Sequence, residues 1–259
     1  MNATIRYVLI TAIRDRFLIA IVIALLAMIG LCRMLASTAL AEGQALGLSF
    51  GGELSRAILV LGLSIFICFH VRRLHETREI EAILARPISR TGFVLGYYAG
   101  FASVALLLAI IVAPLLFAGL GARGIGLLEW EASLLLESLI VVAIGLFAAM
   151  AIAAPAGAVM VTVGLYGLGR MGAYLLAIAH SGSGAVDAEG VNRTADTVMD
   201  FVAAVMPRLD LFGQSSWLVN GPGGGGAANW GVGILVLQVA IYVPLLLLAT
   251  VRDLHVKSF

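Results

Sequence analysis

The sequence is dominated by apolar stretches that are each long enough to cross a lipid bilayer. A spanning α-helix needs about 20 mostly apolar residues. Six stretches meet this requirement, at 17–38, 54–71, 93–120, 134–153, 157–180 and 230–250. Only 12% of the 259 residues are charged, whereas a soluble domain has about 25% charged residues. We therefore expect an all-α integral membrane protein, a single transmembrane domain over 1–259 with six transmembrane helices.

The segments outside these spans differ in polarity. Residues 1–16 place apolar side chains at helical spacing between arginines, a pattern typical of a helix that lies along the membrane interface. Residues 72–92 hold the most charged interval, and residues 181–229 form the longest polar one. The uncharged segment 154–157, Ala-Pro-Ala-Gly, predicts the tight turn between spans four and five.

The distribution of Arg and Lys predicts the orientation. Six spans place both termini on the same side as the loop 72–92. That side would carry Arg6, Arg14, Arg16, Arg72, Arg73, Arg78, Arg86, Arg90, Arg252 and Lys257. The opposite loops would carry Arg56, Arg123, Arg193 and Arg208, beside the interfacial Trp130, Trp217 and Trp230. Because cytoplasmic loops are enriched in Lys and Arg, both termini and the loop 72–92 are expected to be cytoplasmic, with 181–229 extracytoplasmic.

Three ionisable residues inside the predicted spans are candidates for an intramembrane polar site, namely Arg33, Glu137 and Arg170. Each costs about 2.5–3.5 kcal/mol at the bilayer centre on insertion scales, so it normally faces a partner or a wet cavity. All three are expected towards the outer leaflet, where Arg170 can pair with Glu137. Two interpretations stay open: a structural one, with snorkelling side chains or an ion pair that clamps helices, and a polar site on a substrate path.

The charged interval 72–92 is the second candidate site. Its sequence contains RRLHETREIEAILARPISR, which predicts a short helix that ends before Pro87. A helix just beneath a membrane bundle is a place where a soluble partner can push on the spans. The alternative interpretation is a solvated, positively charged loop without a partner.

The sequence contains no motif for catalysis or nucleotide binding. It has no GxxxxGK[ST] phosphate-binding loop, and its only lysine is Lys257. It also has no GxSxG and no HExxH motif. The formal net charge of +1 gives no basic field for nucleic acid. We therefore expect no enzymatic activity in this chain and no nucleic-acid partner.

Two metal-based interpretations compete with ordinary helix packing for some histidine and sulfur-containing side chains. Histidines within or beside the spans could ligate b-type haem, and soft side chains on the first span could ligate Cu(I). The residues concerned are His70, His75, His180 and His255 for haem, and Met28, Cys32 and Met34 for copper. No two spans each offer a histidine pair at suitable depths, so we assign no metal and no cofactor to this chain. The alternative function is a membrane-embedded haem- or metal-handling protein or enzyme that uses these histidines and the span arginines.

Four segments, in order along the chain, resemble the permease subunits of type-2 ABC exporters, near the nitrous-oxide-reductase maturation permease group. TIRYVLITAIRDRFLIAIV resembles the interfacial helix with its Arg-Asp-Arg approach to span one. EIEAILARPISRTGFVLGYYAG is similar to the acidic residue, short helix and Leu-x-x-Pro-x-Ser-Arg element before span three. PRLDLFGQSSWLV resembles the Pro-x-Leu-x-Leu-Phe element before span six, and VRDLHVKSF resembles the Arg-Asp ending.

This resemblance implies a homodimeric permease in a bacterial cytoplasmic (inner) membrane, driven by a separate cytoplasmic ATPase subunit that holds ATP and Mg. A periplasmic protein is a further partner of such systems. The family's coupling helix follows span two and rests in a groove of the ATPase. By position in the loop, the resemblance assigns this coupling role to Glu76, Thr77, Glu79, Ile80 and Ile83. The substrate stays open among lipids, peptides, sulfur or copper species and small drugs.

Overall fold

The computed structural model describes residues 2–39, 42–77, 89–181, 206–221 and 231–256, and all regular elements within them are helices. The helices are α1 (Asn2–Arg14), α2 (Phe17–Thr38), α3 (Gly43–Glu76), α5 (Arg90–Leu120), α6 (Ile125–Ala151), α7 (Pro155–Ser181), the 3-10 helix η2 (Leu209–Leu211), α9 (Ser216–Asn220) and α10 (Gly231–Val256). Five of these, α2, α3, α5, α6 and α10, are long and apolar enough to cross a membrane. The predicted span 157–180 forms α7, which is not among those five, so a sixth crossing stays a prediction.

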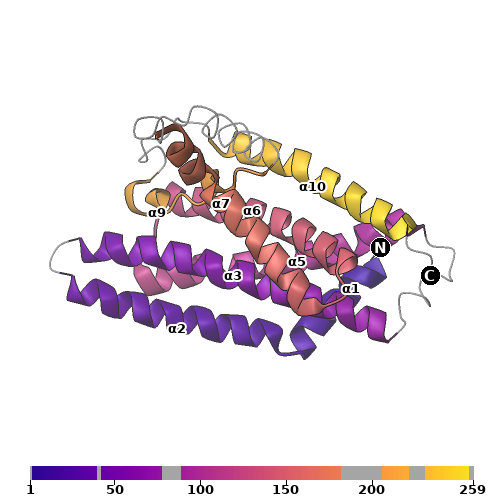
Figure 1. Cartoon of the computed structure of the whole chain (residues 1–259). Coiled ribbons are helices and arrows are strands. Elements are labelled where there is room, and N and C mark those ends of the chain that lie inside the picture. The colour runs from indigo at the N-terminus through magenta and orange to yellow at the C-terminus, as the bar shows by residue number, and fades with distance from the viewer. Residues whose placement is uncertain (1, 40–41, 78–88, 182–205, 222–230, 257–259) are drawn as a thin grey trace.

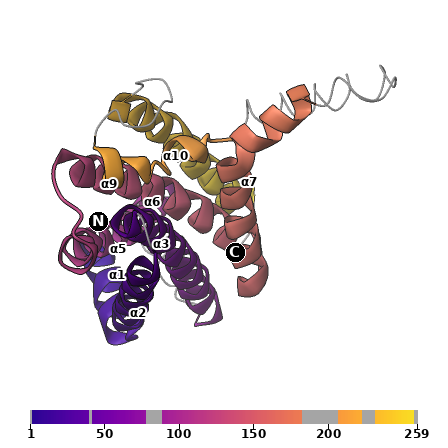
Figure 2. The same ribbon diagram turned by 90° about the vertical axis from the view of Figure 1, so that its left-hand side faces the viewer.

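Helix α6 lies at the centre of the bundle, in contact with α3, α5, α7 and α10 (Figure 1 and Figure 2). Its side chains are buried on nearly every face, as expected of a helix that is apolar all round. Helix α2 packs on the outside, against α3 and α5. Helices α2 and α7 lie on opposite sides of α3 (Figure 2).

The helix termini gather at two ends of the bundle. One end, called here the α1 end, holds α1 together with the C-terminal turns of α3 and α10 (Figure 1). Two side chains tie helices together there. Arg90 at the start of α5 donates to the carbonyl of Leu254 in α10, and Arg72 of α3 donates to the carbonyl of Ala153 between α6 and α7, at 3.1 Å. The other end, called the α9 end, holds η2 and α9.

Helix α1 corresponds to the interfacial helix predicted at 1–16. It packs closely on α5 at a glycine. A Cβ atom on Gly100 of α5 would lie only 2.9 Å from Cγ2 of Val8 in α1. Its opposite face exposes Tyr7, Ile10 and Ile13. An exposed apolar face on a helix that also carries arginines is what an interfacial position requires.

Helix α3 begins much earlier than expected. The sequence predicted a span from 54, but the helix starts at Gly43, because the glycine-rich segment before residue 54 packs closely as a helix. A Cβ atom on Gly47 would lie 3.1 Å from Cβ of Ala36 in α2, and one on Gly52 would lie 2.8 Å from Cδ1 of Leu218 in α9. Small residues of this kind let membrane helices approach closely. The turn predicted at 154–157 is confirmed to the extent that α6 ends at Ala151 and α7 begins at Pro155.

Candidate functional site

Four charged side chains form a cluster towards the α9 end of the bundle, called here the buried cluster after its two deeply buried members, Arg56 and Glu137, whereas Glu53 at its edge is 40% exposed. They are Glu53 and Arg56 of α3, Glu137 of α6 and Arg170 of α7. The side chains of Arg56 and Glu137 are each only 1% exposed. Charges this deeply buried are stable only when they are paired and hydrogen-bonded, so the contacts of each member decide what the cluster can do.

Arg56 is held on three sides. One guanidinium nitrogen donates to the carboxylate of Glu137, and the other donates to the hydroxyl of Ser133 at 2.6 Å and to the carbonyl of Trp130 at 3.3 Å. The Trp130 ring lies 4.7 Å from the guanidinium carbon, in cation–π contact. The Trp130 ring, expected at the outer membrane interface, is fully buried in the bundle beneath Arg56, and its depth in the membrane stays a prediction. The assignment of Arg56 to an outer loop is wrong, because Arg56 lies within helix α3.

Glu137 is shared between two arginines. Its second oxygen accepts from Arg170 at 3.2 Å and from the hydroxyl of Tyr166 at 3.0 Å. The expected pairing of Arg170 with Glu137 is thus present. Arg170 also donates to Glu53, so its guanidinium bridges α3 and α6 from its position on α7.

The segment between η2 and α9 closes over Arg170. Gly213 lies so close to the guanidinium group that a Cβ atom at this position would overlap it. The neighbouring Gly169 contacts the residues just before η2, since a Cβ atom there would lie 2.8 Å from the carbonyl oxygen of Pro207. Arg170 therefore connects three helices and the segment 206–221.

Arg33 does not join this cluster. It lies on an exposed face of α2 and lines a separate cleft of about 500 Å³ with Gln44 and Arg123. Arg33 was expected towards the outer leaflet, at a depth comparable to that of Glu137, but the rotation of α2 points its side chain away from the cluster. The members that the sequence interpretation missed, Glu53 and Arg56, are an acid and a base spaced i,i+3 on one helix face, and this spacing is the signal that could have found them.

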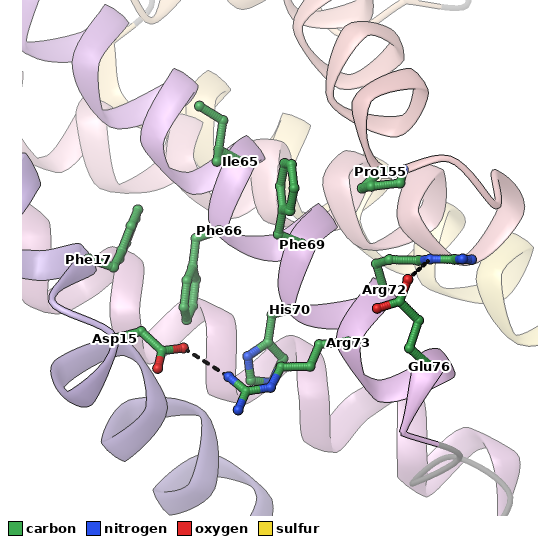
Figure 3. A pocket seen from close by; sticks show the side chains of 10 residues that line it. All are labelled: Asp15, Phe17, Ile65, Phe66, Phe69, His70, Arg72, Arg73, Glu76 and Pro155. Atoms are coloured by element: carbon green, nitrogen blue, oxygen red, sulfur yellow. Dashed lines mark hydrogen bonds and ion pairs between the residues drawn. The ribbon is translucent and has the colours of Figure 1, made fainter.

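A cleft at the α1 end, called here the α1-end cleft, has a volume of about 500 Å³ (Figure 3). It lies between the junction of α1 and α2, the C-terminal part of α3 and the start of α7. Ten residues line it, namely Asp15, Phe17, Ile65, Phe66, Phe69, His70, Arg72, Arg73, Glu76 and Pro155. Figure 3 shows the ion pairs Arg73–Asp15 at 3.4 Å and Arg72–Glu76 at 2.9 Å along its charged edge.

Two of the five residues assigned to ATPase coupling can be placed. Glu76 is the last residue of α3 and pairs with Arg72. Thr77 follows it, and both its backbone N–H and its hydroxyl donate to the carbonyl of Arg73 at 2.9 Å, which closes the end of the helix. The remaining three, Glu79, Ile80 and Ile83, lie outside the described residues, as does the short helix expected before Pro87.

Four of the side chains considered for metals, His70, His75, Cys32 and Met28, have ordinary packing contacts. The His70 ring is buried among aromatic rings, 5.4 Å from Phe101 and 5.5 Å from Phe66 between centroids, and a ring nitrogen of His75 lies 2.9 Å from the carbonyl oxygen of Val71. The thiol of Cys32 contacts the sulfur of Met28 at 3.6 Å, whereas Met34 is 60% exposed on another face of α2. Within the described part of the chain, no three His, Cys, Asp or Glu side chains gather as metal ligands.

In comparison with known proteins, no family model matches this sequence and no curated protein matches it either.

Proposed function

We propose that this chain is the membrane-spanning permease subunit of an ABC exporter whose ATPase is a separate polypeptide. The observation that carries the proposal is the way in which two neighbouring arginines anchor the end of α3. Arg73 pairs with Asp15 at the junction of α1 and α2, and Arg72 donates to the carbonyl of Ala153 at the junction of α6 and α7. A displacement of this end of α3 is therefore passed to two other helix pairs at once.

The length of α3 supports its role as a lever. The helix contains 34 residues. At a rise of about 1.5 Å per residue it is about 51 Å long. The hydrocarbon core of a bilayer is only about 30 Å thick. The charged end of α3, from Arg72 to Glu76, therefore extends to the lipid surface or beyond it.

The contacts at this end of α3 are weak enough to be exchanged. The side chains of Arg73 and Asp15 are 54% and 41% exposed. Exposed ion pairs contribute only about 0.2–1 kcal/mol. A partner driven by ATP hydrolysis can therefore replace such a contact with one of its own.

The positions of the charges support an orientation with the α1 end in the cytoplasm and with α7 as a sixth crossing. Among the residues that the structure describes, the α1 end holds seven arginines, namely Arg6, Arg14, Arg16, Arg72, Arg73, Arg90 and Arg252. The α9 end holds Arg33, Arg123 and Arg208, together with Arg56 and Arg170 of the buried cluster, so seven arginines at the α1 end stand against five. This surplus agrees with the enrichment of Arg and Lys on the cytoplasmic side of bacterial inner membranes. The partners are then a second copy of the chain and two cytoplasmic ATPase subunits.

Site-directed cross-linking tests the proposal. The chain carries a tag, is expressed in its own host, and has a single introduced cysteine in a background in which Cys32 and Cys68 are replaced by alanine. With Thr77→Cys, at the end of α3, we expect cross-links to an ABC-type ATPase. With the matched control Arg123→Cys, between α5 and α6, we expect none. Purification without any ATPase, or cross-links from Arg123→Cys alone, would refute the proposed function.

A further inference from the structure

The lining of the α1-end cleft is divided between an apolar half and a charged half. Along α3, Ile65 and Phe69 come first and Arg73 follows about 12 Å beyond Ile65 towards the α1 end, at about 1.5 Å per residue. The ring of Phe17 faces the apolar half from α2 (Figure 3). Ile65 is 47% and Phe69 is 54% exposed, so this apolar half is open to whatever surrounds the bundle.

The charged half has donors available beyond its ion pairs. A guanidinium carries five N–H donors, and the described contacts of Arg73 engage one nitrogen, at 3.4 Å from Asp15. The side chains of Arg72 and Arg73 are 39% and 54% exposed. The lining itself holds two arginines and two carboxylates, Asp15 and Glu76, and Arg14 and Arg16 lie outside it at the same end of the bundle, which gives that end a surplus of positive charge.

We infer that the α1-end cleft binds an anionic phospholipid, with its phosphate at Arg72 and Arg73 and an acyl chain against Phe17, Ile65 and Phe69. The cleft volume of about 500 Å³ suits a headgroup and the adjoining part of one chain, since pockets of about 300–1,000 Å³ hold ligands of comparable size. The amphipathic helix α1 places the charged half at headgroup depth, and anionic lipids attract basic side chains there.

A lipid fits this cleft better than a peptide does. A peptide would have to bring its backbone N–H and C=O groups to the depth of Ile65 and Phe69, where lipid supplies them with no hydrogen-bond partners. An acyl chain carries no such groups. The inference goes beyond the proposed function, because a permease, an enzyme or a scaffold could each hold a lipid at this position.

Native mass spectrometry of the full chain, after exchange into mild detergent, measures the binding of dioleoyl phosphatidylglycerol relative to dioleoyl phosphatidylcholine. For wild type we expect one tightly retained phosphatidylglycerol. R72Q/R73Q is expected to weaken it about 30-fold, the effect of losing two arginine–phosphate attractions. The control R14Q/R16Q removes the same charge at the same end but outside the cleft lining, and it is expected to have a much smaller effect.

A second pair of variants tests the apolar half. Phe69→Ser is expected to weaken phosphatidylglycerol binding about tenfold through lost apolar contact. Phe50→Ser, on the same helix at the α9 end and similarly exposed at 51%, is expected to leave it unchanged. Losses in both cleft variants and in neither control support the site, and any other pattern overturns it. If R72Q/R73Q does not fold, Phe69→Ser against Phe50→Ser decides alone. The ATPase cross-link of Thr77→Cys reports on the proposed function separately.

Discussion

Removal of the Glu137 carboxylate is expected to be among the most destabilising single changes in this chain. In Glu137→Leu, Arg56 stays buried without a carboxylate, and Arg170 keeps only Glu53. Breaking a buried pair by removing one partner costs about 3–5 kcal/mol. Tyr166 also loses its acceptor, which adds about 1 kcal/mol. We therefore expect the free energy of unfolding to fall by about 4–6 kcal/mol.

A variant of Arg56, the ion-pair partner of Glu137, distinguishes the loss of the ion pair from a simple loss of packing. Arg56→Met leaves Glu137 with Arg170 and Tyr166, so it is expected to cost less than Glu137→Leu. The double variant R56M/E137L is expected to recover most of the stability lost in Glu137→Leu and to lie within about 1–2 kcal/mol of wild type, because replacing a buried ion pair with apolar side chains of similar volume is often neutral, and only the contacts of Tyr166 and Arg170 with Glu137 remain lost. Ser133 tolerates the loss of Arg56, since its hydroxyl also donates to the carbonyl of Trp130 at 2.7 Å.

Reversible unfolding by sodium dodecyl sulfate in mixed micelles, followed by tryptophan fluorescence, provides the assay for all four corners of this double-mutant cycle. The matched control is the exposed pair at the α1 end, tested with Asp15→Asn and Arg73→Met. For this control we expect a coupling energy below about 1 kcal/mol. A double variant R56M/E137L that is as unstable as Glu137→Leu would refute the reasoning. So would a coupling energy at the buried pair no larger than that of the control.

Two glycine variants test how neighbouring segments close on the bundle. Gly213→Ala is expected to push the Arg170 guanidinium away from its carboxylates and to lower the free energy of unfolding by about 1–3 kcal/mol. In an Arg170→Met background this loss of stability should vanish. An equal loss in that background would contradict the proposed clash with Arg170. Gly100→Ala is expected to lift α1 from α5 at Val8, seen as faster amide hydrogen exchange in α1. Gly164→Ala, where a Cβ atom meets nothing within 4 Å, serves as control for both and should not reproduce either effect.

The apolar runs predicted most of the bundle because lipid imposes a minimum length on a spanning helix. The stretch 17–38 coincides with α2, and the turn before Pro155 lies where the proline and glycine indicate. The start of α3 could not be predicted in this way, because residues 43–53 are rich in glycine and polar side chains. Their helical state depends on Leu218 and other neighbours that are distant in sequence.

The candidate site was predicted only in part, for a related reason. Depth along a helix follows from residue number, so Glu137 and Arg170 were expected at the same level, and they do meet. Rotation about the helix axis depends on which face packs against a neighbour. Arg33 occupies a comparable depth but points away from the cluster, and Arg56 enters it because α3 turns that face towards α6. Hydropathy carries too little information on rotation to separate these two arginines.

The two halves of α3 are held with unequal strength, and this difference has a mechanical consequence. Arg56 lies in a buried cluster in which every charged side chain is paired, whereas Arg72 and Arg73 make exposed contacts. Each exposed ion pair contributes only about 0.2–1 kcal/mol, so a force on the charged end of α3 displaces that end more easily than it displaces Arg56. We therefore expect α3 to pivot about the buried cluster, with a lever arm of about 26 Å from Arg56 to Arg73 at about 1.5 Å per residue. Because α2 and α7 flank α3, such a pivot changes the separation of its neighbours mainly at the α1-end cleft, while the α9 end stays closed.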